Sequence, residues 1–265
     1  MMPKRPALTP GLGWLVASAI ALLGTALVVF SDSAVYWRSQ TADAQSTMPK
    51  DEFERRVRAY LLEHPEVIAE ALQRLELRER AAQASAVKSV LQTRAEELLR
   101  DPASPVGGNP QGDVTLVEFF DYNCPYCRQV VPHIEKAQTI DPKLRIVYKE
   151  FPILGPNSTF AAKAALAAHR QGKYAALHKA LMETKGTVTE KTVLDAVGQL
   201  GLDVKRLRAD MADPAIQAHI ERNLALARAL NINGTPSFVV GEQIVPGAVD
   251  LATLERLIRE AREKK

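Results

Sequence analysis

The sequence is short of cysteine: it has two among 265 residues, Cys124 and Cys127. A small domain held together by disulfides carries several well-separated cysteines, so that class of protein is excluded. A disulfide between these two residues would close a very short loop and add little stability. We therefore interpret the pair as reactive.

The sequence also lacks the features of a nucleic-acid-binding surface. Its net charge is +3, from 34 basic and 31 acidic residues, and aromatic residues make up 6% of it. No dense Lys/Arg run is interleaved with aromatics, as contacts to phosphates and bases would require. We exclude nucleic acid as a partner.

One stretch near the N-terminus has no charged residue. Residues 11–30 are apolar and about long enough to cross a bilayer as a helix, and Lys4 and Arg5 precede them. This predicts a cytoplasmic stub and transmembrane signal-anchor over 1–31, with the rest of the chain on the other side of the membrane. The alternative is a signal peptide cleaved after Ala44, at the end of a small-x-small pattern. That site lies well downstream of the apolar run, which favours the anchor.

A helical region is expected after a flexible, polar spacer over 32–50. Within 51–100, two helices should meet near His64-Pro65, and a long helix should follow from Glu76 to Arg100, where Gly and Pro are absent. The apolar stripe of the long helix is thin. Two interpretations stay open: it packs against another copy of the chain, or it is a solvated helix that packs lightly on its own domain.

Helix-breaking residues mark the next boundary and predict a linker over 101–113, followed by a folded domain over 114–265. In that domain we expect a helical block at about 157–230. Without the block, the order is strand, helix, strand, then strand, strand, helix, which is the thioredoxin arrangement. The predicted fold class is α/β: a thioredoxin fold with an inserted helical block, preceded by the helical extension and the transmembrane helix. The expected strands are Val114–Phe120, Leu144–Phe151, Ser237–Val240 and Gln243–Val245, and the expected helices are Cys124 to about Thr139, Ser158–Glu183, Glu190–Leu200, Val204–Met211, Pro214–Leu230 and a last one from Asp250.

The two cysteines are spaced for disulfide exchange. Cys124 falls where a strand turns into a helix, and Pro125 follows at a position that needs no amide hydrogen. The helix dipole and free N–H groups there lower a thiol pKa and produce an accessible nucleophile. Cys127, one turn further, is placed to attack the mixed disulfide that Cys124 forms with a substrate.

Two other interpretations of the cysteine pair fit the sequence less well. A zinc site needs four ligands, and the candidate histidines His133, His169 and His178 have no ligand-like spacing to the motif. Two inert core cysteines fit poorly with a proline between them at a helix start. We expect no metal and no cofactor.

Two segments resemble the DsbA-like family of the thioredoxin superfamily. Residues 117–127, VEFFDYNCPYC, look like its strand and active-site motif, and residues 234–238, GTPSF, look like its cis-proline loop. The resemblance implies a cis Thr235–Pro236 bond beside the dithiol, offering backbone groups to an extended substrate. The alternative is an ordinary trans turn.

The resemblance assigns roles to further residues. It implies that Glu118 is a buried acid that moves protons to and from Cys127. Lys149, on the next strand, is a candidate partner for that acid. The alternative is an exposed Glu and Lys that aid solubility. Pro125 and Tyr126, between the cysteines, should tune how oxidising the couple is.

The segment from Asp51 to Leu77 resembles the N-terminal region of ScsC-like members of this family, which trimerises some of them. The resemblance implies a protein of the bacterial inner membrane with its catalytic domain in the periplasm, acting on exported proteins with cysteines and served by a membrane partner of DsbB or DsbD type. The direction, whether oxidase, isomerase or reductase, stays open. The alternative function is a copper-binding or chaperone module on the same scaffold, without turnover.

Overall fold

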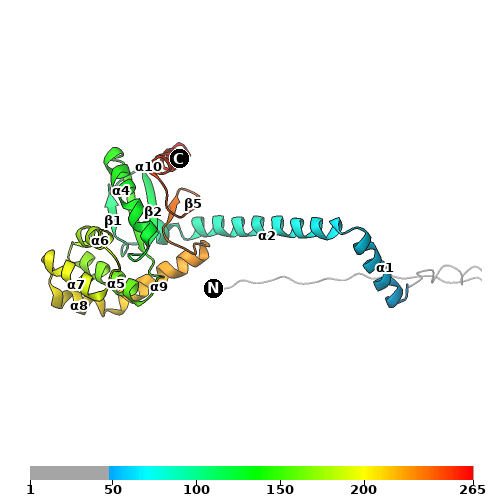
Figure 1. Cartoon of the computed structure of the whole chain (residues 1–265). Coiled ribbons are helices and arrows are strands. Elements are labelled where there is room, and N and C mark those ends of the chain that lie inside the picture. The colour runs from blue at the N-terminus through cyan, green and yellow to red at the C-terminus, as the bar shows by residue number, and fades with distance from the viewer. Residues whose placement is uncertain (1–47, 265) are drawn as a thin grey trace, which may run out of the picture. The chain divides into compact units, whose positions relative to one another are not determined.

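The computed structural model describes residues 48–264, and the chain divides into two compact units between Ile68 and Ala69 (Figure 1). The predicted anchor at 1–31 and nearly all of the spacer at 32–50 lie outside the described residues. Among the described helices, none is both long and apolar enough to cross a membrane.

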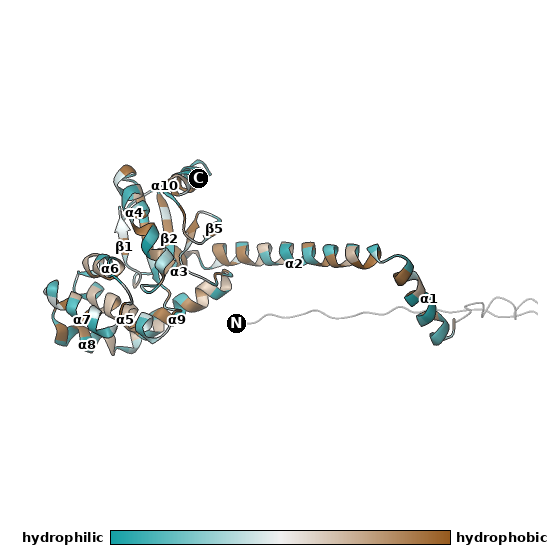
Figure 2. Ribbon diagram, in the orientation of Figure 1, coloured by the Kyte–Doolittle hydropathy of each residue, from teal (hydrophilic) through white to brown (hydrophobic). Residues whose placement is uncertain are grey.

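The helical extension comprises α1 (Lys50–Glu63), α2 (Glu66–Thr93) and α3 (Ala95–Arg100). The break at His64-Pro65 lies where the sequence predicts it, because a proline disfavours helical backbone in the residue before it. The predicted long helix differs in both its limits. It begins at Glu66 instead of Glu76, and it is interrupted at Arg94, whose guanidinium binds both carboxylate oxygens of Glu97 at 2.7 Å. Figure 2 shows polar and apolar residues alternating along α2.

The segment 101–113, predicted to be a linker, is part of the folded domain. It contains β1 (Val106–Gly108), which pairs antiparallel with β3. A side chain at Gly107 would lie 2.9 Å from the Tyr148 ring, and Gly108 has a φ of +65°. The glycines are therefore needed for close approach to the sheet, which the sequence alone could not distinguish from linker composition.

A five-stranded mixed sheet, of order β1-β3-β2-β4-β5, forms the centre of this domain. β2 pairs parallel with β3 and antiparallel with β4, and β4 pairs antiparallel with β5. This is the predicted thioredoxin arrangement, and the strand limits agree with the sequence to within one residue. The strands are β2 (Val114–Phe120), β3 (Leu144–Glu150), β4 (Ser237–Val240) and β5 (Gln243–Pro246).

Helices cover both faces of the sheet. Leu116 and its neighbours on one face pack against α4 (Pro125–Ile140) and α10 (Leu251–Glu263). Val117 and Phe119, on the opposite face, pack against α3, the end of α2 and α9. This double burial explains why β2 is a nearly continuous apolar run.

The helical block comprises α5 (Pro156–Arg170), α6 (Tyr174–Met182), α7 (Glu190–Gln199), α8 (Val204–Met211) and α9 (Pro214–Ala229), gathered beyond one end of the sheet (Figure 1). It shares a buried core with Phe120, Tyr122 and the two cysteines. The helix predicted over Ser158–Glu183 is divided at Gly172, whose φ of +69° ends α5.

Candidate active site

The two cysteines lie at the junction between β2 and α4. Cys124 caps the helix with an extended backbone, and Pro125 occupies the first turn. Both cysteines are free thiols. Cys124 is 4% exposed and Cys127 is fully buried, so the sulfur predicted to attack is the one with remaining access, and that access is narrow.

The surroundings of Cys124 favour its ionised form and lower its thiol pKa to about 5. The largest cause is a hydrogen bond from the Cys127 thiol, which outweighs the opposing effect of burial. The Thr235 hydroxyl and the backbone N–H groups of Cys127 and Tyr126 add to it. The position of Cys124 at a helix start predicts that its thiol pKa is lowered. The largest cause of the lowering, the hydrogen bond from the Cys127 thiol, does not follow from that position.

Cys127 behaves in the opposite way. Burial raises the pKa of its thiol far above the ordinary range, and donation to Cys124 and the nearby charge of Glu118 raise it further. The reduced site therefore holds one thiolate at Cys124 and one proton at Cys127, the distribution that a nucleophile and a resolving thiol need.

Glu118 lies on β2 with 1% exposure, and its Oε1 atom has no hydrogen-bond partner among the described residues. Burial, followed by repulsion from Cys124, raises its pKa to about 8. The side chain lines a cavity of about 470 Å³ together with Tyr148 and His178. A carboxyl in this state can hold a proton at neutral pH beside the dithiol.

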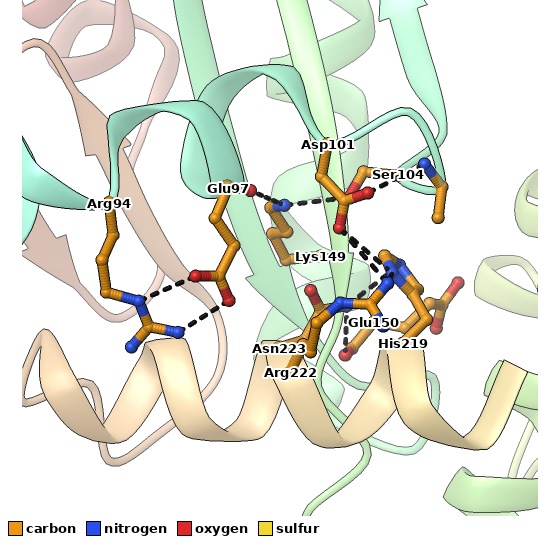
Figure 3. Close-up of polar contacts among 10 residues, drawn as sticks. Arg94, Glu97, Asp101, Ser104, Lys149, Glu150, His219, Arg222 and Asn223 are labelled. Carbon is orange, nitrogen blue, oxygen red and sulfur yellow. Dashed lines mark hydrogen bonds and ion pairs between the residues drawn. The ribbon is translucent and has the colours of Figure 1, made fainter. Parts of the chain in front are cut away.

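Lys149 is not paired with Glu118. In the register of β2 and β3 it stands opposite Phe119, while Tyr148 stands opposite Glu118, so the two side chains occupy opposite faces of the sheet. The Lys149 amine donates to the Glu97 carbonyl at 2.6 Å and to Ser104 Oγ at 2.8 Å (Figure 3). Its pKa is lowered to about 8, mainly by burial. The prediction of a Glu118–Lys149 pair was wrong because strand alternation separates them.

Lys149 belongs to a polar cluster that joins α3 to the sheet and α9 (Figure 3). His219 lies 3.3 Å from Asp101, and its pKa is lowered to about 4, mainly by burial. Asn223 donates to the Glu150 carbonyl at 3.2 Å. We assign this cluster a structural role on the face away from the dithiol.

The Thr235–Pro236 bond is cis, as expected. The Cys124 sulfur lies 3.2 Å from the Thr235 carbonyl oxygen, to which it can donate when protonated, so the loop lies directly against the reactive sulfur. The pairing of β2 with β4 brings it there, because Phe119 stands opposite Ser237.

Two exposed apolar side chains belong to segments close to the cysteine motif. Tyr126 is 58% exposed and Leu154 is 50% exposed. Leu154, Pro125 and Asn123 line one shallow pocket. This surface suits contacts with an unfolded polypeptide rather than with a small polar molecule.

Two residues to which the sequence argument gave no role position the motif. Asp121 accepts from the backbone N–H of Asn123 at 2.8 Å and from those of Ile153 and Leu154 at 2.9 Å. Asn123 accepts from the backbone N–H of Val188 at 2.8 Å. Their polar character between an apolar strand and Cys124 was the available signal.

A buried network of side chains connects the motif to the helical block. Glu150 accepts hydrogen bonds from the hydroxyls of Tyr122 and Tyr174, at 3.0 and 2.9 Å. Burial raises the Glu150 pKa well above its usual value and lowers that of His178 to about 3, so both groups are held neutral. Nowhere in 48–264 do three or more His, Cys, Asp or Glu residues gather in a group that could hold a metal ion.

Comparison with known families gives two matches. The DSBA-like thioredoxin domain matches residues 115–259, and the N-terminal domain of the copper resistance protein ScsC matches residues 50–82. The sequence resemblances to DsbA-like and ScsC-like proteins are thereby confirmed.

Solved structures support the same assignment. A thioredoxin-like oxidoreductase from Silicibacter pomeroyi is 50% identical, with a TM-score of 0.62, and the match covers 63% of this chain and 97% of that one. The catalytic domain of Proteus mirabilis ScsC is 32% identical, with a TM-score of 0.61, covering 66% and 98%.

A curated relative, the Na⁺/H⁺ antiporter NhaA 1 of Salinispora arenicola, is 30% identical over 158 residues. The match covers 59% of this chain and 24% of the antiporter, so the chain spans about a quarter of that relative's length.

Proposed function

Because the chain belongs to the DSBA-like thioredoxin domain family, we propose that it is a thiol–disulfide oxidoreductase that oxidises cysteine pairs of exported proteins through Cys124 and Cys127. The observation that carries the proposal is the Cys124 pKa of about 5. A thiolate stabilised in this way stabilises the reduced protein, and a couple whose reduced form is stabilised is an oxidant.

The reaction begins from the Cys124–Cys127 disulfide. A client thiolate attacks the Cys124 sulfur, and the Cys127 sulfur leaves and takes a proton, for which we propose Glu118 as the donor. A second client thiolate then attacks the client sulfur of the mixed disulfide, and Cys124 leaves as a thiolate. The client loses two electrons to form its disulfide, and the protein ends with both sulfurs reduced.

The environment of each sulfur fits its step. Cys124 is a good leaving group because its thiolate is stabilised, which speeds release of the oxidised client. Cys127 is buried and cannot remain ionised, so it must be protonated as it leaves. The cavity beside Glu118 has room for water through which that proton can be replaced.

Return to the disulfide requires an oxidant, and we propose a membrane partner of DsbB type for that step; a DsbD-type partner would instead keep the site reduced. The uncharged run over residues 11–30 supports anchoring in the inner membrane with the catalytic domain in the periplasm.

We further propose that the helical extension assembles the chain into an oligomer, of which the trimer is the candidate. No residue of α1 is buried, although Phe53, Val57 and Tyr60 lie along it at helical spacing and are 57%, 38% and 54% exposed. A helix of this length is marginal in water alone, so an apolar side of this kind favours a partner.

The reduction potential tests the proposed direction. We expect the dithiol, equilibrated with glutathione buffers, to give a value closer to about −120 mV, typical of strong disulfide donors, than to about −270 mV, typical of thioredoxin. A value near the lower figure would contradict the oxidase role. Refolding of scrambled ribonuclease then tests disulfide shuffling separately.

A further inference from the structure

A groove runs beside the cis-proline loop, between that loop and helix α2. Its floor is formed by Ser237 together with Ile244 and Pro246 of β5. One wall is the loop that leads into the cis-proline. The other wall is the side of α2 that carries Ala84 and Val87. The groove has a volume of about 520 Å³.

The α2 wall is fixed to the catalytic domain. Val87 packs against the buried cluster that includes Leu230 and Ile232, and Leu91 belongs to that cluster. Lys88 forms an ion pair with Glu242, in the turn between β4 and β5, at 3.4 Å. Figure 1 shows this end of α2 beside β5. The helical extension therefore supplies a permanent side to the groove.

The groove borders the loop that contacts the reactive sulfur. Gly234 and Ser237 line it, and they flank Thr235-Pro236 in the chain. The Thr235 carbonyl oxygen lies 3.2 Å from the Cys124 sulfur. A client cysteine bonded to Cys124 would therefore lie beside the loop whose flanking residues line the groove.

The lining suits an extended peptide. Val87 and Ile244 offer apolar contacts, and Arg80 and Gln83 add polar groups from α2. The exposed amide side chains of Asn231 and Asn233 also line the groove, where they can hydrogen-bond to a peptide backbone. The volume lies within the range of about 300–1,000 Å³ that is usual for ligand sites, enough for a few consecutive side chains.

We propose that this groove binds the polypeptide segment next to the reactive cysteine of a client, with apolar side chains facing α2. The inference rests on the proposed function, because it needs a client held at Cys124. It gives the helical extension a role in substrate selection in addition to assembly.

The test compares Ala84→Trp with Ala86→Trp in the full chain. Ala84 lines the groove; Ala86 is exposed on the same helix, about 200° around its axis, and is not in the lining. The reduced form of each variant is mixed with one of two disulfides, and the rate constant of the reaction is measured. The first is an aromatic small-molecule disulfide. The second is a peptide whose cysteine is blocked as a mixed disulfide and has apolar residues beside it. We expect Ala84→Trp to lower the rate constant for the peptide about tenfold, the factor that burial of one apolar side chain supplies. The small disulfide should react at an unchanged rate, and Ala86→Trp should change neither rate.

An unchanged rate constant for the peptide in Ala84→Trp would overturn the proposal, and so would an equal fall of that rate constant in Ala86→Trp. A change in the sedimentation coefficient of Ala84→Trp alone would also overturn it, because it would assign the groove to a second copy of the chain. Failure of the unsubstituted protein to react with either disulfide would refute the proposed function itself, and so the two failures are distinguishable.

Discussion

Glu118 lies close enough to Cys127 for its charge to oppose ionisation of that thiol, and its Oε1 atom makes no hydrogen bond to any of residues 48–264. The buried carboxyl therefore lowers the free energy of unfolding. Its position beside a thiol that must gain and lose a proton gives it a use, because a group with a pKa of about 8 can exchange protons near neutral pH.

Replacement of this acid should stabilise the protein and slow its chemistry. A carboxyl whose pKa is raised from 4.5 to about 8 holds its proton in the folded state while the unfolded chain has lost it, so stability falls as pH rises between these values. We expect Glu118→Gln to remove that fall and to raise the unfolding free energy at pH 8 by on the order of 3 kcal/mol. Denaturant titrations at pH 5 and pH 8 measure the difference.

The exposed Glu255→Gln is the matched control and should leave the pH dependence unchanged. In disulfide exchange, Glu118→Gln should slow the step in which Cys127 changes its protonation state by about a hundredfold. Equal rates in the variant and the unsubstituted protein would rule out the proton-transfer role.

Lys149 lies on the face of β2 and β3 opposite to Glu118, so its replacement should change stability without changing the dithiol. At pH 10, where the folded-state amine with its pKa of about 8 is neutral, Lys149→Met should lower the unfolding free energy by about 2 kcal/mol, since the Glu97 carbonyl and Ser104 lose a buried donor. The pKa of Cys124 should not move. Thiolate absorbance measures the pKa of Cys124 in this variant. A shift of that pKa would show that Lys149 acts on the active site.

The amine also sets a second pH dependence. Its pKa falls from 10.5 to about 8 on folding, so between these values the unfolded chain binds more protons and stability rises with pH. Lys149→Met should abolish this rise, which unfolding curves at pH 8 and pH 10 would detect. Persistence of the rise would assign it to another group.

Assembly through α1 is tested by Val57→Glu against Ala59→Glu. Both introduce the same charge, but Val57 lies in line with Phe53 and Tyr60, whereas Ala59 lies about 200° around the helix from it. We expect the first variant to sediment as a monomer and the second to keep the state of the unsubstituted chain. A monomeric unsubstituted chain would refute the oligomer proposal outright.

Much of this arrangement could be predicted from sequence because local pattern and local structure agree. The strand before the cysteines and the helix after them are encoded by an apolar run followed by Cys124-Pro125, and both appear where expected. The cis bond at Thr235–Pro236 came from family resemblance rather than from any local rule.

What could not be predicted depends on register and long-range packing. A one-residue offset between β2 and β3 decides whether Lys149 faces Glu118, and sequence alternation within one strand does not fix that offset. The support that Asp121 gives to Ile153 and Leu154 joins segments more than thirty residues apart. The glycines of β1 predict a linker because their close approach to Tyr148 becomes apparent only in the folded sheet.

We propose that Cys124 is a thiolate at neutral pH, held in that state chiefly by the Cys127 thiol. Ultraviolet thiolate absorbance of the reduced full chain, followed against pH with Cys124→Ser as the blank, tests it most directly. We predict a single transition near the pKa of about 5, absent from Cys124→Ser and shifted upward in Cys127→Ala, which removes the largest stabilising hydrogen bond. A transition near the value of about 8.5 for a free thiol would contradict the account.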